Sequence, residues 1–148
     1  MLAIPSVLSE TLWLIGHVLF YLKPVHPDQV LAIISNLKSS ASCGTDEISS
    51  YVLQLVKHEI TPVITHVVKL SISQQIFPVL WKKAKVIPLH KKGEVLYPKN
   101  YRPVSLLCVC SKILERCVFS QLNQYLEENG LLHPFHHGFR AKHSTASA

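Results

Sequence analysis

The amino-acid sequence predicts an α+β fold that is mostly helical and contains one antiparallel β-hairpin. Apolar residues recur at helical spacing in several separate segments, whereas one stretch near the middle alternates and is broken by a Lys-Lys-Gly turn. The 148 residues are 48% hydrophobic and 16% charged, which is the composition of a globular chain with a core. The chain is therefore expected to fold around a hydrophobic core.

The hairpin is predicted from two short apolar runs separated by a cationic turn. Ala84 to Leu89 forms the first run, Lys91-Lys92-Gly93 the turn, and Pro103 to Leu107 the second run. Lysines crowd the first arm and Arg102 opens the second. Because ammonium and guanidinium groups bind phosphate oxygens, this arrangement suits a polyphosphate or a nucleic-acid backbone. A solvated edge hairpin whose lysines prevent aggregation is the alternative interpretation.

Three helices are predicted before the hairpin. The first begins at Asp28 and ends near Lys38, and the second follows a loop of small residues with Asp46 as its N-terminal cap. The third begins at Thr61-Pro62, where proline costs no hydrogen bond, and stops before Pro78. The residues expected to face inward are Val30, Ile33, Ile34 and Leu37, then Ile48, Val52, Leu55 and Val56, then Ile64, Val67, Val68 and Ile72.

A longer amphipathic helix follows the hairpin. It begins at Ser111 and ends at Asn129-Gly130. A loop from Leu131 to Phe139 then leads to a short final helix that Ser144 would cap. The inward side of the long helix is expected to carry Ile113, Leu114, Val118, Leu122, Tyr125 and Leu126.

The first 24 residues contain an apolar run from Leu12 to Leu22 that includes Gly16 and His17. This run is too short to span a bilayer, and no basic residue precedes it as in a signal peptide. We therefore predict a helix that is buried or packed against a partner, and no membrane association. A signal-anchor is the alternative.

Positive charge is concentrated in the second half of the chain. Residues 1 to 80 hold four Lys against five acids, a net charge of −1, whereas residues 81 to 148 hold eleven Lys plus Arg against four acids, a net charge of +7. Such a field attracts an anionic polymer of any sequence, with an affinity that falls as salt rises.

Cysteine and histidine usage predicts an intracellular protein without a structural metal. The four cysteines have no C-x-x-C spacing, so we interpret them as reduced thiols, with nucleus and cytoplasm equally open. His133, His136, His137 and His143 cluster without a recognised zinc spacing, which favours surface and turn histidines.

Several ordered blocks resemble the front of the reverse transcriptase domain of non-LTR (LINE-type) retrotransposons. They read W-K-x-A-x-V-x-P-x-x-K-K-G from Trp81, N-Y-R-P-V-S-L-L from Asn100, S-K-I-L-E-R from Ser111 and G-F-R-x-x-x-S-T from Gly138. Upstream, S-C-G-T-D-E-I from Ser42 is similar to the family's S-x-G-x-D-x-I block, and F-P-x-x-W-K from Phe77 also fits. The resemblance covers residues 25 to 148 and leaves residues 1 to 24 outside. The departures are His136 in place of the usual Gln and Cys43 where Pro is frequent.

The resemblance implies roles for five cations. Lys91, Lys92 and Arg102 match positions that lie over the triphosphate of the incoming deoxynucleotide, and Arg140 and Lys142 belong to a block that borders the template. The implied partners are an RNA template or RNA–DNA hybrid and, in the complete enzyme, a deoxynucleotide. A surface salt bridge is the alternative for Arg102.

The sequence also predicts what this polypeptide does not do alone. Polymerases of this family hold Mg²⁺ with aspartates, but the chain has only Asp28 and Asp46 and none of the family's later F-x-D and A-D-D blocks. We therefore expect a fingers segment without the palm, binding no cofactor, with Mg²⁺ required only in the complete polymerase. Whether the chain counts as an enzyme stays open. The alternative function is a decayed or domesticated remnant that acts as a basic nucleic-acid-binding or protein-binding module.

Overall fold

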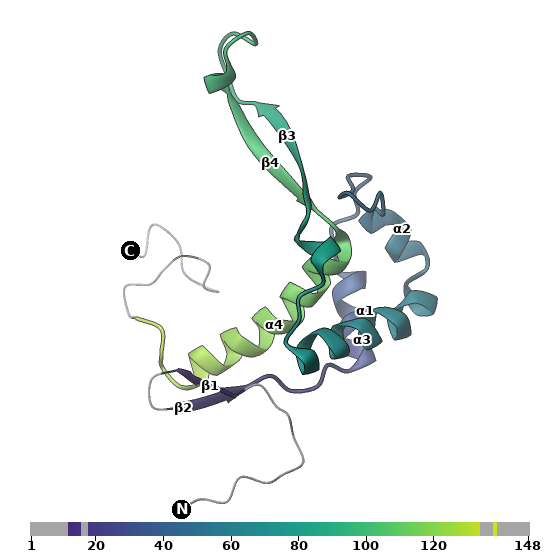
Figure 1. Ribbon diagram of the computed structural model, residues 1–148, viewed down its shortest axis with the longest axis vertical. Coiled ribbons are helices and arrows are strands. Elements are labelled where there is room, and N and C mark those ends of the chain that lie inside the picture. Colours follow the sequence, from purple (N-terminus) through teal and green to yellow (C-terminus); the bar gives the residue numbers. More distant parts are fainter. Residues whose placement is uncertain (1–11, 16–17, 134–137, 139–148) are drawn as a thin grey trace, which may run out of the picture.

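The computed structural model describes residues 12–15, 18–133 and 138, and it confirms the α+β class (Figure 1). A helical body is built from α1 (Pro27–Ser35), α2 (Ser50–Leu55), α3 (Lys57–Gln74) and α4 (Val109–Glu128). The predicted hairpin is formed by β3 (Ala84–His90) and β4 (Tyr101–Leu107), and it projects away from the helices as a long arm (Figure 1). Short 3₁₀ turns, η1 (Val79–Lys82) and η2 (Pro98–Asn100), lie at its base and near its tip.

The core lies between α1, α3 and α4. Val30 and Ile34 of α1, Val68 of α3 and Ile113 of α4 have no exposed surface, as the helical spacing of the apolar residues predicts. Burying an aliphatic side chain of this size contributes roughly 1.5–3 kcal/mol, so these contacts hold the body together. The long helix α4 ends as predicted, with Asn129 as its C-terminal cap and Gly130 at a φ of 61°.

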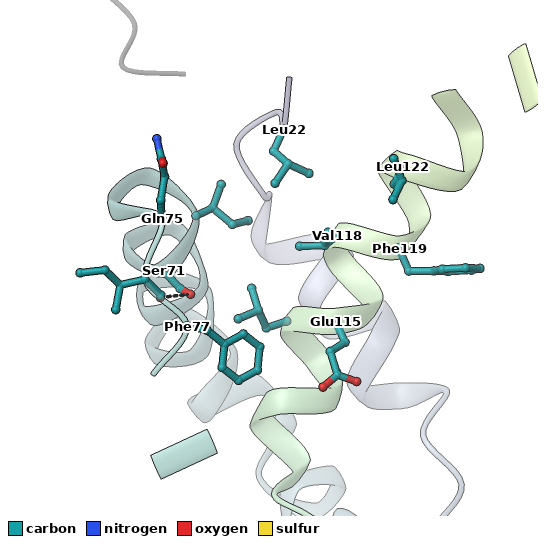
Figure 2. Close-up of a pocket in the computed structure, with 11 residues that line it drawn as sticks. Leu22, Ser71, Gln75, Phe77, Glu115, Val118, Phe119 and Leu122 are labelled. Carbon is teal, nitrogen blue, oxygen red and sulfur yellow. Dashed lines mark hydrogen bonds between the residues drawn. The ribbon is translucent and has the colours of Figure 1, made fainter. Parts of the chain in front are cut away.

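An apolar groove of about 440 Å³ opens between α3 and α4, beside the segment that precedes α1 (Figure 2). Leu22, Phe77 and Val118 line it together with other apolar side chains. At one edge the Ser71 hydroxyl donates a 2.7 Å hydrogen bond to the Ile76 carbonyl oxygen, which closes the chain reversal after α3.

The prediction for the second helix was wrong in its cap and its buried face. Ser49, not Asp46, caps α2, because the Ser49 hydroxyl accepts a hydrogen bond from the Val52 amide. Asp46 instead accepts from the Ile48 amide within the preceding loop. The helix turns Ser50 and Leu53 inward, since the Ser50 hydroxyl donates to the Lys38 carbonyl oxygen and accepts from the Ser40 amide. The expected inward residues Ile48, Val52, Leu55 and Val56 are all exposed.

The third helix begins four residues earlier than predicted. Helix α3 starts at Lys57, directly after α2, so Pro62 lies inside it rather than at its first position. Proline in a helix removes one backbone hydrogen bond. Here its ring faces solvent, and the neighbouring Thr61 hydroxyl donates to the Lys57 carbonyl oxygen within the same turn. Packing of the buried residues of α3 therefore outweighs the preference of Pro62 for the first position of a helix.

The expected helix at Leu12 to Leu22 is a second hairpin. Strands β1 (Leu12–Ile15) and β2 (Val18–Tyr21) pair antiparallel, with Leu12 opposite Tyr21. Branched and aromatic residues favour strands, which is why this apolar run pairs as strands. The buried Phe20 ring lies 4.9 Å from that of Tyr125, which docks β2 on α4. Within the described part of the chain, no helix is both long and apolar enough to cross a membrane.

Candidate nucleic-acid interface

The arm formed by β3 and β4 has a regular register in which its two prolines lie opposite each other. Ala84 pairs with Leu107, Pro88 with Pro103 and His90 with Tyr101. The ladder continues one step further, since the Lys91 amide donates a 2.8 Å hydrogen bond to the Asn100 carbonyl oxygen. Counting back by twos from that bonded pair, Pro88 and Pro103 form a non-hydrogen-bonded pair, so neither proline removes a ladder bond. Their missing amides lie on the two outer edges, where they discourage further strand pairing.

The register places two of the three predicted phosphate-binding residues on one face. Leu89 lies opposite Arg102, and Lys91 lies opposite Asn100, so Lys91 and Arg102 are diagonal neighbours on the same side of the arm. Lys85 follows on that side nearer the base. The three predicted residues Lys91, Lys92 and Arg102 are all exposed.

The arm carries a dense and uncompensated positive charge. Seven cations lie between residues 82 and 102, against the single acid Glu94. All seven are exposed, and none of them forms an ion pair with a described carboxylate, since the one such pair is between His26 and Asp28. Because no described carboxylate neutralises these cations, the arm keeps a positive potential that attracts anions. The seven cations are Lys82, Lys83, Lys85, Lys91, Lys92, Lys99 and Arg102.

The turn at the end of the arm is longer than the predicted Lys-Lys-Gly and spans residues 91–100. Three side chains hold it by hydrogen bonds to three consecutive carbonyl oxygens. The His90 Nε2 atom lies 3.0 Å from that of Gly93, Asn100 Nδ2 donates over 2.7 Å to that of Glu94, and Tyr101 Oη donates over 2.9 Å to that of Val95. These three hydrogen bonds give the turn a defined conformation.

Tyr101, which was not among the predicted site residues, has a structural role in this turn. Its ring packs edge-on against His90 at 5.2 Å while its hydroxyl bonds the turn. Gly93 has a φ of +84°, and a Cβ there would lie 2.8 Å from Asn100 Nδ2, so glycine is required for the turn to close.

The base of the arm is fixed to the body by the block around Gly44. A Cβ at Gly44 would lie 2.6 Å from the backbone nitrogen of Cys108, where β4 leads into α4. Cys108 caps α4, because its Sγ accepts from the Ser111 amide and the Ser111 hydroxyl donates to its carbonyl oxygen. The S-C-G-T-D-E-I block thus contributes a close backbone approach that orients the arm.

The described residues do not fit a catalytic metal. Mg²⁺ needs an octahedral set of oxygen ligands, supplied in part by carboxylates. Asp28 lies in the first turn of α1 beside His26, and Asp46 bonds the Ile48 amide in a separate loop. No group of three or more His, Cys, Asp or Glu side chains comes together within the described ranges. No metal-dependent step is therefore assigned to these residues.

Some predicted features lie outside the described residues. They include the template-binding candidates Arg140 and Lys142, the cap at Ser144 and three of the clustered histidines, His136, His137 and His143. All four cysteines are described, and they are free thiols. Burial raises the pKa of the Cys110 and Cys117 thiols to about 11, with Cys108 and Asp46 adding to the effect at Cys110.

Sequence reasoning counted Lys82, Lys83 and Lys85 among the cations of the hairpin without assigning them to the site, and it missed Leu96. Lys82, Lys83 and Lys85 extend the cationic surface to the base of the arm, and strand alternation alone places Lys85 on the Arg102 face. Leu96, at the tip, gives no signal in the sequence beyond an apolar residue in a turn. Its exposure depends on the hydrogen bonds of the turn.

Comparison with known proteins supports the resemblance at a coarse level. The chain is 30% identical over 125 residues to the probable RNA-directed DNA polymerase from transposon BS of Drosophila melanogaster, and 31% identical over 123 residues to that from transposon X-element of the same species. It is 27% identical over 125 residues to the RNA-directed DNA polymerase from mobile element jockey of Drosophila melanogaster. These matches cover 84%, 82% and 84% of this chain.

The chain spans 14% of the length of each of these three relatives. No protein-family model matches it. What the comparisons show is distant homology to RNA-directed DNA polymerases of transposable elements over a short segment of those proteins.

Proposed function

We propose that this chain is the N-terminal fingers part of the reverse transcriptase of a non-LTR retrotransposon, and that its β3–β4 arm contacts RNA template and nucleotide phosphates. The observation that carries the proposal is the projecting arm with seven exposed cations and one acid, in a chain homologous to RNA-directed DNA polymerases. Such an arm has the charge and the reach to follow a phosphate backbone.

Within the arm, Lys91, Lys92 and Arg102 would bind the triphosphate of the incoming deoxynucleotide. Support for this comes from Lys91 and Arg102 sharing one face and from the Arg102 guanidinium having no ion-pair partner among the described carboxylates. A guanidinium can bind two phosphate oxygens at once. Arg140 and Lys142 would contact the template strand. The palm that holds Mg²⁺ would be supplied by other parts of a complete polymerase.

Binding to RNA or to an RNA–DNA hybrid should be weak, independent of sequence and strongly dependent on salt. Fluorescence anisotropy of labelled single-stranded RNA with the 148-residue polypeptide, at several salt concentrations, tests this. Each phosphate contact contributes about 0.7 to the slope of log affinity against log salt for a single strand. Lys83→Ala and Lys85→Ala should each lower the slope by about that amount. An affinity that hardly changes with salt would remove the electrostatic basis of the proposal.

The nucleotide role of Arg102 can be separated from a general charge effect. In a chimera that joins this segment to the remainder of the transposon BS polymerase, Arg102→Ala should mainly raise the KM for deoxynucleotide. A charge-assisted bidentate contact contributes about 1.5–3 kcal/mol, so the expected loss is about tenfold to a hundredfold in kcat/KM. Template affinity should change little.

Lys99→Ala is the matched control, because Lys99 lies on the same arm but outside the positions implied for the triphosphate. Equal effects of the two substitutions on nucleotide kinetics would refute the specific role of Arg102. They would favour a second candidate function, a basic nucleic-acid-binding or protein-binding module that does not polymerise. The observation behind that candidate is the lack of a carboxylate cluster among the described residues.

A further inference from the structure

The tip of the arm presents three consecutive apolar residues to solvent. Leu96 is 86% exposed, the highest value among the large hydrophobic side chains that the structure describes, and Val95 and Tyr97 on either side of it are 63% and 52% exposed. Neither residue 95 nor residue 96 pairs with a strand. An apolar side chain at the end of a projecting arm is free to enter a partner.

The exposure is built into the turn. Hydrogen bonds from His90, Asn100 and Tyr101 fix the carbonyl oxygens of residues 93 to 95, which immediately precede Leu96. On the other side, the Asn100 amide donates a 3.0 Å hydrogen bond to the Tyr97 carbonyl oxygen. With the backbone held at both ends, Leu96 cannot fold back onto the arm without breaking these bonds.

Cations lie on both sides of this apolar tip. Lys91 and Lys92 precede it on the β3 side, and Lys99 and Arg102 follow it on the β4 side. The Lys99 ammonium lies 5.3 Å from the centre of the Tyr97 ring, so the positive charge reaches the edge of the apolar residues. The apolar tip is therefore flanked by cations from both strands that can hold an anionic backbone beside it, and two of them, Lys91 and Arg102, share one face of the arm.

The distribution of charge favours nucleic acid over a membrane surface as the partner. Attraction to an anionic lipid surface falls off within about a Debye length, so only the cations beside the apolar tip would contribute to it. Here the cations continue down the arm through Lys85 to Lys82 and Lys83 at the base. A polyanion that runs along the arm uses all of them, and proteins do insert leucine side chains between base steps.

We infer that the tip is a wedge that inserts Leu96 between bases at a junction between paired and single-stranded nucleic acid, while the cations of the arm hold the backbone. This inference rests on the proposed function, because it requires the arm to bind nucleic acid. It adds the form of the substrate: a forked hybrid rather than a uniform strand.

The test uses the 148-residue polypeptide and a forked RNA–DNA hybrid that carries 2-aminopurine in the first base pair at the fork. Unstacking of that base raises its fluorescence. The wild-type polypeptide should raise the fluorescence of the fork, and Leu96→Ala should abolish the rise while binding the hybrid with an unchanged salt slope. Leu80→Ala is the matched control, because Leu80 is also an exposed leucine (70%) but lies in η1 at the base of the arm, and it should behave as the wild type. Circular dichroism checks that the variants fold.

The outcomes separate the wedge from the binding function. Binding of the wild type without a fluorescence rise, or an equal rise with Leu96→Ala, overturns the wedge and leaves the proposed function standing. Equal loss of the rise in both leucine variants also overturns it. No binding of RNA or hybrid by the wild type overturns both proposals. Leu96-dependent binding to vesicles of phosphatidylserine and phosphatidylcholine, with no rise at the fork, would overturn the wedge in favour of a lipid surface.

Discussion

Replacing Gly44 by alanine tests the close approach that fixes the base of the arm. The new Cβ would lie 2.6 Å from the Cys108 nitrogen, 2.8 Å from the Leu107 carbonyl carbon and 2.9 Å from the Cys108 Cα. All three are backbone atoms, so no side chain can rotate away. Ordinary contact begins at 3.4 Å, so the loop or the start of α4 must shift by about 0.8 Å.

The sign of the change in the free energy of unfolding tests the close approach of Gly44 to the Cys108 backbone. Gly44 does not have a positive φ, so alanine meets no backbone strain there. Without the overlap, alanine would stabilise the fold by about 0.4–1 kcal/mol, by reducing the entropy of the unfolded chain. With it, the substitution should destabilise by about 1–3 kcal/mol, the usual cost of overpacking.

Urea unfolding followed by circular dichroism measures this difference. Gly138→Ala is the control, because a Cβ at Gly138 meets no atom within 4 Å, and it should leave the free energy of unfolding unchanged or raise it by up to about 1 kcal/mol. A Gly44→Ala variant that is as stable as the wild type, or more stable, would refute the packing argument.

Three further predictions address the body and the chemistry. The Gln121 side chain accepts a 2.7 Å hydrogen bond from the Lys23 amide and donates one to the Lys23 carbonyl oxygen. Gln121→Ala should therefore lower the free energy of unfolding in urea by about 1–3 kcal/mol. Gln124→Ala should lower it less, because the Gln124 side chain bonds only an exposed glutamate. Burial raises the pKa of the Cys110 and Cys117 thiols from 9.0 to about 11. The free energy of unfolding should therefore fall as pH rises from 9 to 11, by up to about 1.4 kcal/mol per pH unit for each thiol. The fall should be less steep in the variant with both cysteines replaced by alanine. The 148-residue polypeptide should incorporate no deoxynucleotide on primed RNA with Mg²⁺ or Mn²⁺, and incorporation above a mock-purified control would contradict the proposed lack of metal ligands.

The parts of the fold that the sequence predicted well are those where one local signal dominates. The β3–β4 pairing follows from two apolar runs around a glycine-containing turn, and α4 ends at its Asn-Gly pair. The α2 face could not be predicted in this way, because its six residues are shorter than two full turns and their orientation depends on the Ser50 hydroxyl bonding Lys38. The β1–β2 hairpin was missed because a short apolar run does not distinguish helix from strand.

The same distinction applies to the candidate site: some of its features follow from local sequence signals and others do not. Cations can be counted in the sequence, and the antiparallel register of β3 and β4 places Lys91 and Arg102 on one face. The tip could not be predicted, because its shape depends on three side chains bonding carbonyl oxygens three to six residues away. No periodicity reports such bonds.

The arm has few contacts that would hold it in isolation, and this bears on its role. A two-stranded hairpin is marginally stable in water, and all but the first residue of β3 is exposed. Its order depends on the Gly44 contact at the base, the proline pair in the middle and the hydrogen bonds at the tip. These contacts fix the backbone while leaving most of β3 and part of β4 exposed to solvent, which is what a binding arm requires and a core element does not. A nucleic acid that binds the ordered arm would stabilise it by mass action, so binding and ordering of the arm are expected to be coupled.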